Sequence, residues 1–237
     1  MSDITWDNLY TDHAAAYEIL VSHEDYQDNL LRAIQSIQPL AGTVAAEFGA
    51  GTGRLTALLA RHVRRLHAFD FTYSMLRLAQ LKQRREGWSN VSLALADSRR
   101  MPVRPGWANL AVEGWAFLQI AVWHPQDWQV QLGRALDEMQ RLVRPGGRLI
   151  LIETLGTGET APKVVPFFRE VYAFLEAERG FTPQDTIRTD YRFENMQQIQ
   201  QVVLPLFGRE MLERLVRTET GWVLPECTGL WWREVTI

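Results

Sequence analysis

The chain has 237 residues, of which 46% are hydrophobic and 22% are charged, a globular mix that argues against a disordered, collagen-like or coiled-coil protein. Its 25 basic and 28 acidic residues give a net charge of −3, which weighs against nucleic acid as the main partner because there is no overall attraction to phosphate. The single cysteine, Cys227, allows neither an internal disulfide nor a multi-cysteine metal site, so no metal is expected.

The first forty residues predict helical structure. Ser22 followed by Asp25 is a candidate helix cap, and apolar residues then recur at helical spacing until Pro39 ends the pattern. The sequence shows no signal peptide, and no stretch approaches 18 uninterrupted apolar residues. We therefore expect a cytoplasmic protein without a membrane span.

From residue 43 onward, short apolar segments alternate with helical patterns. The predicted strands cover residues 43–48, 66–69, 91–96, 107–112 and 148–153. A long predicted helix over 128–143 is stopped by Pro145-Gly146-Gly147. This alternation predicts βαβ units and a parallel sheet covered by helices on both faces. The remaining chain is expected to complete the same sheet, with helices over 166–178 and 195–217 and strands over 186–193 and 222–235.

An acidic residue ends or follows each of the five predicted strands: Glu47, Asp70, Asp97, Glu113 and Glu153. In parallel sheets, ligands bind beyond the carboxyl ends of the strands. A row of acids along that edge is unusual for purely structural reasons, so the pattern predicts a ligand site there.

A glycine loop follows the first predicted strand, in the segment Glu47-Phe48-Gly49-Ala50-Gly51-Thr52-Gly53. Glycines allow a tight turn and a close approach of ligand to backbone, and the amides of the loop and following helix can face a polar group. Asp70 lies 21 residues after Gly49, a spacing that suits an acid binding ribose hydroxyls.

Two classes of cofactor fit this loop. A dinucleotide site would need a small residue where Arg54 stands, and Glu47 would repel a pyrophosphate. An acid at that place suits a ligand with an ammonium group, and S-adenosylmethionine combines ribose, adenine and such a group. A nicotinamide-dependent oxidoreductase on a related sheet stays open as an alternative.

From about Val44 to Thr154 the chain resembles the class I S-adenosylmethionine-dependent methyltransferases of the small-molecule type. Four elements in order carry the resemblance, each weak alone and fairly specific together: the E-x-G-x-G-x-G loop, Asp70 with Ser74-Met75-Leu76, Ala96-Asp97-Ser98, and the helix ending in Leu142-Val143-Arg144-Pro145-Gly146-Gly147. The resemblance implies an α/β fold, a Rossmann-like, doubly wound, mostly parallel seven-stranded sheet with helices on both faces and an antiparallel strand near the C-terminus.

The resemblance also implies a single domain over residues 1–237. Within it, residues 1–40 would form a helical cap, 41–158 the cofactor-binding core, and 159–237 the lid helices and the completion of the sheet. The activity implied is transfer of a methyl group to an oxygen, nitrogen or carbon atom of a small molecule. A non-catalytic protein that binds the same cofactor is a further alternative.

The resemblance implies that the following residues hold the cofactor: Glu47, Gly49, Gly51, Gly53, Asp70, Phe71, Met75, Asp97, Ser98 and Glu113. Glu47 would orient the glycine loop or meet the amino group through water. Asp70 would hold both ribose hydroxyls, and Asp97 would accept from the adenine amine. Phe71 and Met75 would pack near ribose and adenine, although core packing is the alternative for Met75.

Six residues are candidates for the acceptor side: Tyr10, Tyr17, Glu113, Trp115, Trp123 and His124. Glu113 and His124 are the predicted catalytic residues. Glu113 could bind the cofactor or a polar group of the acceptor, and His124 could be a general base because the ordinary pKa of a histidine lies near neutrality. The two tryptophans would wall a flat or cationic acceptor. Core packing for the tryptophans and a capping or surface position for His124 are the alternatives.

Overall fold

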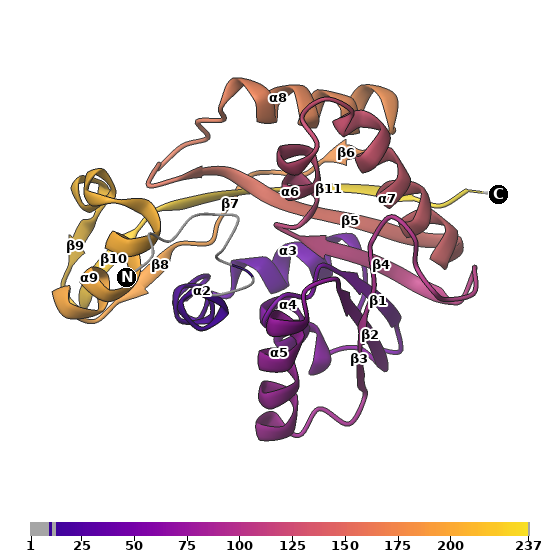
Figure 1. Ribbon diagram of the computed structural model, residues 1–237, viewed down its shortest axis with the longest axis horizontal. Helices are drawn as coiled ribbons and strands as arrows, with labels where there is room; N and C mark the ends of the chain where they lie inside the picture. Colours follow the sequence, from indigo (N-terminus) through magenta and orange to yellow (C-terminus); the bar gives the residue numbers. More distant parts are fainter. Residues whose placement is uncertain (1–9, 11–12, 237) are drawn as a thin grey trace.

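The computed structural model describes residue 10 and residues 13–236, and its centre is a parallel sheet (Figure 1). The parallel strands are β1 (Val44–Phe48), β2 (Arg65–Asp70), β3 (Val91–Leu95), β4 (Ala108–Gly114) and β5 (Val143–Thr157). They lie in the order β3-β2-β1-β4-β5. The first four match the predicted strands to within two residues, whereas β5 starts earlier because its backbone pairs through the proline-glycine segment, where the Gly146 amide donates to Val235 at 2.8 Å.

The helices cover both faces of this sheet, as predicted (Figure 1). One face carries α3 (Asn29–Ile37), α4 (Arg54–Ala60) and α5 (Tyr73–Glu86). The other carries α6 (Phe117–Trp123), α7 (Trp128–Leu142) and α8 (Pro166–Ala173), the last continuing as a π-helical turn over Phe174–Glu178. The strand order reverses at β1, so the crossovers diverge there and leave a crevice at the carboxyl edge.

The C-terminal strand β11 (Glu226–Glu234) runs antiparallel along β5. Two short strands, β6 (Thr182–Pro183) and β7 (Ile187–Arg188), pair with different parts of β11 and share the outer edge. Within the described residues the sheet is therefore seven positions wide, in the order β3-β2-β1-β4-β5-β11-β6. This confirms the predicted seven-stranded sheet with an antiparallel strand near the C-terminus.

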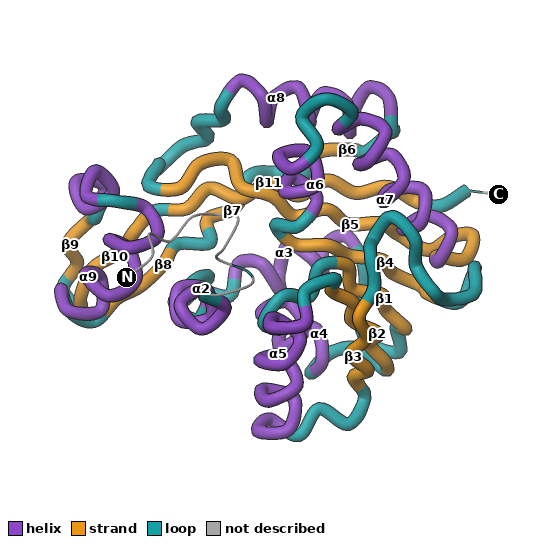
Figure 2. The backbone as a smooth tube through the Cα atoms, viewed as in Figure 1, coloured by secondary structure: helices purple, strands orange, loops and turns teal. Residues whose placement is uncertain are grey.

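A second, small antiparallel sheet was not predicted. It consists of β8 (Tyr191–Phe193), β10 (Gly221–Leu224) and β9 (Val216–Thr218), with α9 (Met196–Phe207) and a 3-10 helix (Arg209–Arg214) beside it (Figure 2). The single strand expected over 186–193 is wrong, because the chain leaves the main sheet after β7 and continues in β8. Asp190 fixes that departure, since its carboxylate accepts the Glu226 amide at 2.8 Å.

The N-terminal helices α2 (Ala14–Val21) and α3 are joined by a turn that Asp25 organises. Its carboxylate accepts the amides of Asn29 and Leu30 at 2.9 and 3.0 Å, so Asp25 caps α3. Ser22 does not act as the N-cap, because its hydroxyl donates to the Ile19 carbonyl at the end of α2. No helix in the described part of the chain is long and apolar enough to cross a membrane.

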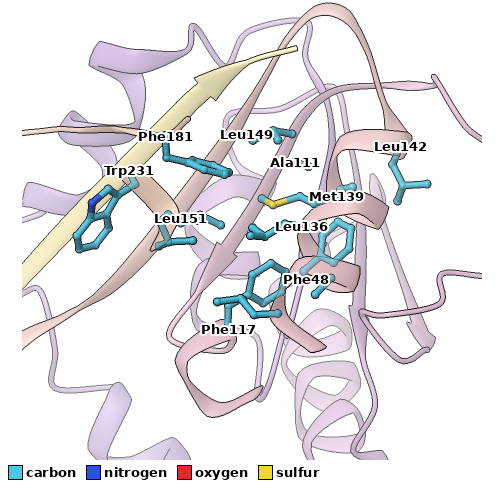
Figure 3. Packing of buried hydrophobic residues seen from close by; sticks show 14 of the residues in the cluster. Phe48, Ala111, Phe117, Leu136, Met139, Leu142, Leu149, Leu151, Phe181 and Trp231 are labelled. Carbon is cyan, nitrogen blue, oxygen red and sulfur yellow. The ribbon is translucent and has the colours of Figure 1, made fainter. Parts of the chain in front are cut away.

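The main core lies between the sheet and α7 (Figure 3). Leu136 and Met139 from α7 lie in one cluster with Phe48 of β1 and Leu151 of β5, and Trp231 extends this cluster along the same face of the sheet to β11. All five side chains are at most 4% exposed. This core fixes the sheet edge on which the candidate site is built.

We expect Leu136→Ala to lower the free energy of unfolding by about 2–5 kcal/mol, because it removes buried methyl groups and leaves a cavity. Val130→Ala on the same helix is the control, since Val130 is 53% exposed and its truncation should change stability by about 0.5 kcal/mol or less. Urea denaturation of both variants measures the difference. Equal midpoints for the two variants would contradict the assigned core.

Candidate functional site

The acids predicted at the strand ends meet at one edge of the sheet, but they differ in burial. Glu47, Asp70, Glu113 and Glu153 are buried, at 1%, 8%, 0% and 2% exposure. Asp97 lies further out, with a side chain 46% exposed. Buried carboxylates need hydrogen-bond partners, so the loops around them must supply donors.

Asp70 joins the glycine loop to the start of α5. Its Oδ2 accepts the Gly51 amide at 2.8 Å, and its Oδ1 accepts the Thr72 amide at 2.7 Å. Burial raises the pKa of Asp70, and these backbone amides oppose that shift. The carboxylate retains lone pairs for further donors, because each of its oxygens accepts two hydrogen bonds.

The glycine loop adopts a conformation that few other residues would tolerate. Gly49, Gly51 and Gly53 have φ angles of +67°, +54° and +85°. At Gly49 a Cβ atom would lie 2.3 Å from the Cβ of Ala116, in the loop after β4. The backbone of the loop after β1 therefore packs directly against the Ala116 side chain in the loop after β4. This contact sets the shape of the crevice between the two loops.

A first cavity lies in this crevice and unites most of the predicted site residues. Its walls include Tyr10, Tyr17, Gly49, Gly51, Asp70, Phe71, Met75, Asp97, Ser98, Trp115, Trp123 and His124. Its two carboxylates are Asp70 and Asp97, and Phe71, Met75 and Ile120 are among the apolar residues of the same wall. Such a surface suits a nucleoside, because hydroxyls meet carboxylates and the flat base meets apolar side chains.

Three predicted site residues do not reach the wall of the first cavity. Glu47 accepts the Thr56 hydroxyl at 2.7 Å, and burial raises the pKa of Glu47 to about 8. Gly53 packs against Ala79 of α5. Glu113 accepts three backbone amides, those of Ala116, Phe117 and Ile152, and its side chain is wholly buried. These residues hold the loops that form the cavity.

Neither of the two predicted catalytic residues has the geometry of a free base. Glu113 has no exposed surface. His124 lines the first cavity, but its Nε2 lies 2.9 Å from Nη1 of Arg99. Since a guanidinium has only donors, His124 must accept that hydrogen bond with the lone pair that a base would use. This arrangement argues against His124 and Glu113 as proton acceptors.

Arg99 also binds the Asp97 carboxylate. Its guanidinium donates to both carboxylate oxygens, with distances of 2.7 to 3.2 Å, and its amide donates to Oδ1 at 2.9 Å. These contacts lower the pKa of Asp97. An amine that binds Asp97 in the first cavity therefore shares that carboxylate with Arg99.

Aromatic rings close the first cavity. Phe71 and Tyr10 contact Trp123 edge to face, with ring centroids 5.4 and 6.1 Å apart, and Tyr10 also contacts Tyr17 at 5.6 Å. Trp115 has a φ of +57°, rare for so large a residue, and the Arg54 guanidinium lies 3.4 Å from its ring centroid. Strained backbone of this kind is typical of functional sites.

A second cavity of about 460 Å³ lies beyond this aromatic wall. Tyr10, Tyr17, Trp115 and Gln119 line both cavities, so they separate one from the other. The second cavity is also lined by residues from distant parts of the chain: Leu20, Val21, Glu24, Arg54, Leu118, Val122, Glu153, Thr154, Thr157, Phe168, Tyr191, Phe207 and Glu226.

Sequence reasoning missed several of these residues. Glu24, Tyr191 and Glu226 stand in no recognisable motif, and only the packing of α2, β8 and β11 brings them to Glu153. The sequence analysis also assigned Trp123 to the acceptor pocket. In the structure Trp123 lines the first cavity and does not line the second. Cys227 is buried, and its thiol donates to the Glu159 carbonyl at 3.3 Å, consistent with the expected packing position.

Residues 45–147 match the model of a family described as a methyltransferase domain. The chain is 31% identical, over 179 residues, to a malonyl-[acyl-carrier protein] O-methyltransferase of Methylococcus capsulatus, covering 70% of this chain and 60% of that protein. It is 25% identical, over 157 residues, to a demethylmenaquinone methyltransferase of Staphylococcus aureus, covering 65% and 58%. The chain thus spans about three fifths of the length of these curated relatives.

Among solved structures, one described as a SAM dependent methyltransferase from Aquifex aeolicus is similar, with a TM-score of 0.54 and 15% identity. The match covers 90% of this chain and 97% of that chain. At this level of identity the likeness concerns the fold, which is the Rossmann-like fold of this family.

We expect Gly49→Ala to destabilise the protein more than Gly42→Ala. Both glycines have positive φ, +67° and +77°, so both variants bear a similar backbone cost of about 1–2 kcal/mol. Only the Gly49 methyl meets Ala116, whereas nothing lies within 4 Å of a Cβ at Gly42, so Gly49→Ala should cost about 1–3 kcal/mol more. Urea denaturation of the pair isolates this contact, and equal losses would show that the two loops can separate freely.

Proposed function

We propose that this chain transfers a methyl group from S-adenosylmethionine to a small molecule. The premise is that residues 45–147 belong to the class I S-adenosylmethionine-dependent methyltransferase family. The observation that carries the proposal is the pairing of two cavities across one aromatic wall. The first offers the glycine loop and Asp70 to a nucleoside cofactor, and the second, of about 460 Å³, has room for an acceptor.

The residues of the first cavity fit the cofactor. The Asp70 carboxylate is fixed by two amides and still has lone pairs that suit the ribose hydroxyls. Phe71 and Met75 give apolar surface for adenine, and Asp97 and Ser98 stand at the same wall for its polar edge. The glycine loop, free of side chains at Gly49 and Gly51, lets the methionine part approach the backbone.

When bound, the cofactor supplies a methyl group on a sulfonium, which is already a very good leaving group. The chain has mainly to orient the acceptor and exclude water. Trp115, Tyr10 and Tyr17 stand between the two cavities and so are the residues proposed to align the acceptor. A dedicated base is optional for this chemistry, because an acceptor atom that is nucleophilic without deprotonation can release its proton to water after the transfer. The engaged positions of Glu113 and His124 are in keeping with such an acceptor.

The second cavity supports a small molecule as acceptor. Carboxylates of Glu24, Glu153 and Glu226 line it, and a nucleic acid would bring phosphates toward them. The segment after residue 159 contributes Phe168, Tyr191 and further wall residues, so we propose that it acts as the lid of one continuous domain.

We expect S-adenosylhomocysteine to raise the melting temperature of the wild-type protein, and NAD and NADP to leave it unchanged. The reason is that a dinucleotide-binding loop needs a small residue at the position that Arg54 occupies. Thermal-shift measurements with the three compounds test this. Stabilisation by NAD or NADP alone would favour the oxidoreductase alternative and refute the proposal.

We also expect Asp70→Asn to weaken S-adenosylhomocysteine binding by about tenfold or more, because an amide cannot accept the Gly51 and Thr72 amides and two ribose hydroxyls together. Asp185→Asn is the matched control, since Asp185 is exposed and lies outside both cavities. Isothermal titration calorimetry gives the two affinities, and a melting curve checks the fold. Unchanged affinity in Asp70→Asn would contradict the ribose assignment.

A further inference from the structure

Glu226 lines the second cavity, and one of its carboxylate oxygens has no hydrogen-bond partner. The residue is 1% exposed, and its Oε1 accepts the Thr154 hydroxyl at 2.6 Å. Among the described residues, none makes a hydrogen bond to Oε2. The Thr157 side chain is near enough to lower the pKa of Glu226, but it does not donate a hydrogen bond to Oε2. A buried acceptor without a donor is costly, so a ligand that supplies one gains the corresponding free energy.

The fold holds this carboxylate in place from both sides. The Glu226 amide donates to Asp190, and Asp190 is itself paired with Arg188 at 2.8 Å. Glu226 begins β11, which starts beside the small sheet (Figure 1) and pairs with the end of β5. The Glu226 backbone is therefore fixed by two sheets, and the Thr154 hydroxyl holds the carboxylate through Oε1.

The second cavity is lined by three glutamates and, among the described residues, by a single basic side chain, Arg54. Arg54 already forms an ion pair with Glu24 and lies over the Trp115 ring. Glu153 adds a second buried carboxylate, whose Oε1 accepts the Leu118 amide at 2.8 Å. The groups left without a counter-charge are thus Glu153 and Glu226.

The rest of the lining is mostly apolar or aromatic, with Gln119, Thr154 and Thr157 as its other polar residues. Leu20 and Val21 come from α2, Leu118 and Val122 from α6, and Phe168 from α8. A ligand that fits has an apolar body and one end rich in N–H donors. A carboxylate on the ligand would find no free counter-charge there, because the Arg54 that could attract it is already paired with Glu24.

We infer that the acceptor carries a basic nitrogen, and that Glu226 Oε2 anchors it by accepting an N–H hydrogen bond in the second cavity. This inference rests on the proposed function, since it concerns the acceptor of the same site. It assigns Glu226 as a specificity-determining residue and leaves the methylated atom of the acceptor unassigned.

The test is calorimetric titration of the full chain, saturated with S-adenosylhomocysteine, with three primary amines: hexylamine, 2-phenylethylamine and tryptamine. Each amine is compared with the alcohol and the carboxylate that have the same carbon skeleton. We expect at least one amine to bind at least tenfold more tightly than its alcohol and its carboxylate. Glu226→Gln should weaken that amine about tenfold while leaving the affinity for the alcohol and for S-adenosylhomocysteine unchanged.

A matched control is Glu234→Gln, at the far end of the same strand, where the side chain is 50% exposed and lies 3.7 Å from Arg148. It should bind amines like the wild type. The inference is overturned if no amine is preferred over its neutral or acidic counterpart, if none binds, or if Glu226→Gln binds amines normally. Failure of S-adenosylhomocysteine itself to bind would instead refute the proposed function.

The same titrations at several pH values give an independent readout. Burial raises the pKa of Glu226 to about 7, so the carboxylate should ionise as the pH rises through 7, while an alkylamine with a pKa near 10 stays protonated. Amine affinity should therefore rise between pH 6 and 8 in the wild type and rise less in Glu226→Gln. The other titratable or charged groups that line the cavity are present in both proteins: Tyr10, Tyr17, Glu24, Arg54, Glu153 and Tyr191. Identical pH profiles would contradict the anchoring role.

Discussion

Buried carboxylates at the carboxyl ends of parallel strands hold the loops of this protein in place. Asp70 accepts the Gly51 and Thr72 amides, Glu113 accepts amides from the loop after β4 and from β5, and Glu153 accepts the Leu118 amide in α6. An acid inside a sheet edge must find donors, and the crossover loops are the nearest source. The crevice therefore has a fixed shape because the loops that border it are bound to the strands beneath them.

Two cavities of different chemistry result from this arrangement. The first joins carboxylates at Asp70 and Asp97 with an apolar floor, and the second joins apolar walls with the carboxylates of Glu153 and Glu226. The wall between them is aromatic and includes Trp115, which is held in an unusual backbone conformation with Arg54 stacked on it. Such a wall would keep a cofactor and an acceptor in a defined relation, as the proposed in-line transfer demands.

The local sequence predicted the parts of the fold that depend on nearest neighbours in the chain. Alternating apolar segments located β1 to β4 to within two residues, and the glycine loop and Asp70 were recognised from spacing alone. The same reasoning failed at residues 186–193, where apolar alternation continues but the chain changes sheets. Periodicity reports that a residue is extended and half-buried, and it carries no information about which sheet receives it.

The sequence by itself predicted the mostly parallel seven-stranded sheet, the resemblance to the methyltransferases and a cofactor side for the site, because a glycine loop, two strand-end acids and their spacing are set by one contiguous βαβ segment. Only the tertiary structure decided what those acids do. It directed Glu47 and Glu113 onto the Thr56 hydroxyl and onto backbone amides, and it gave the His124 lone pair to Arg99. It also assembled the second cavity, since Glu226 lies 73 residues beyond Glu153 in the chain and meets it only through the antiparallel return of β11 along β5.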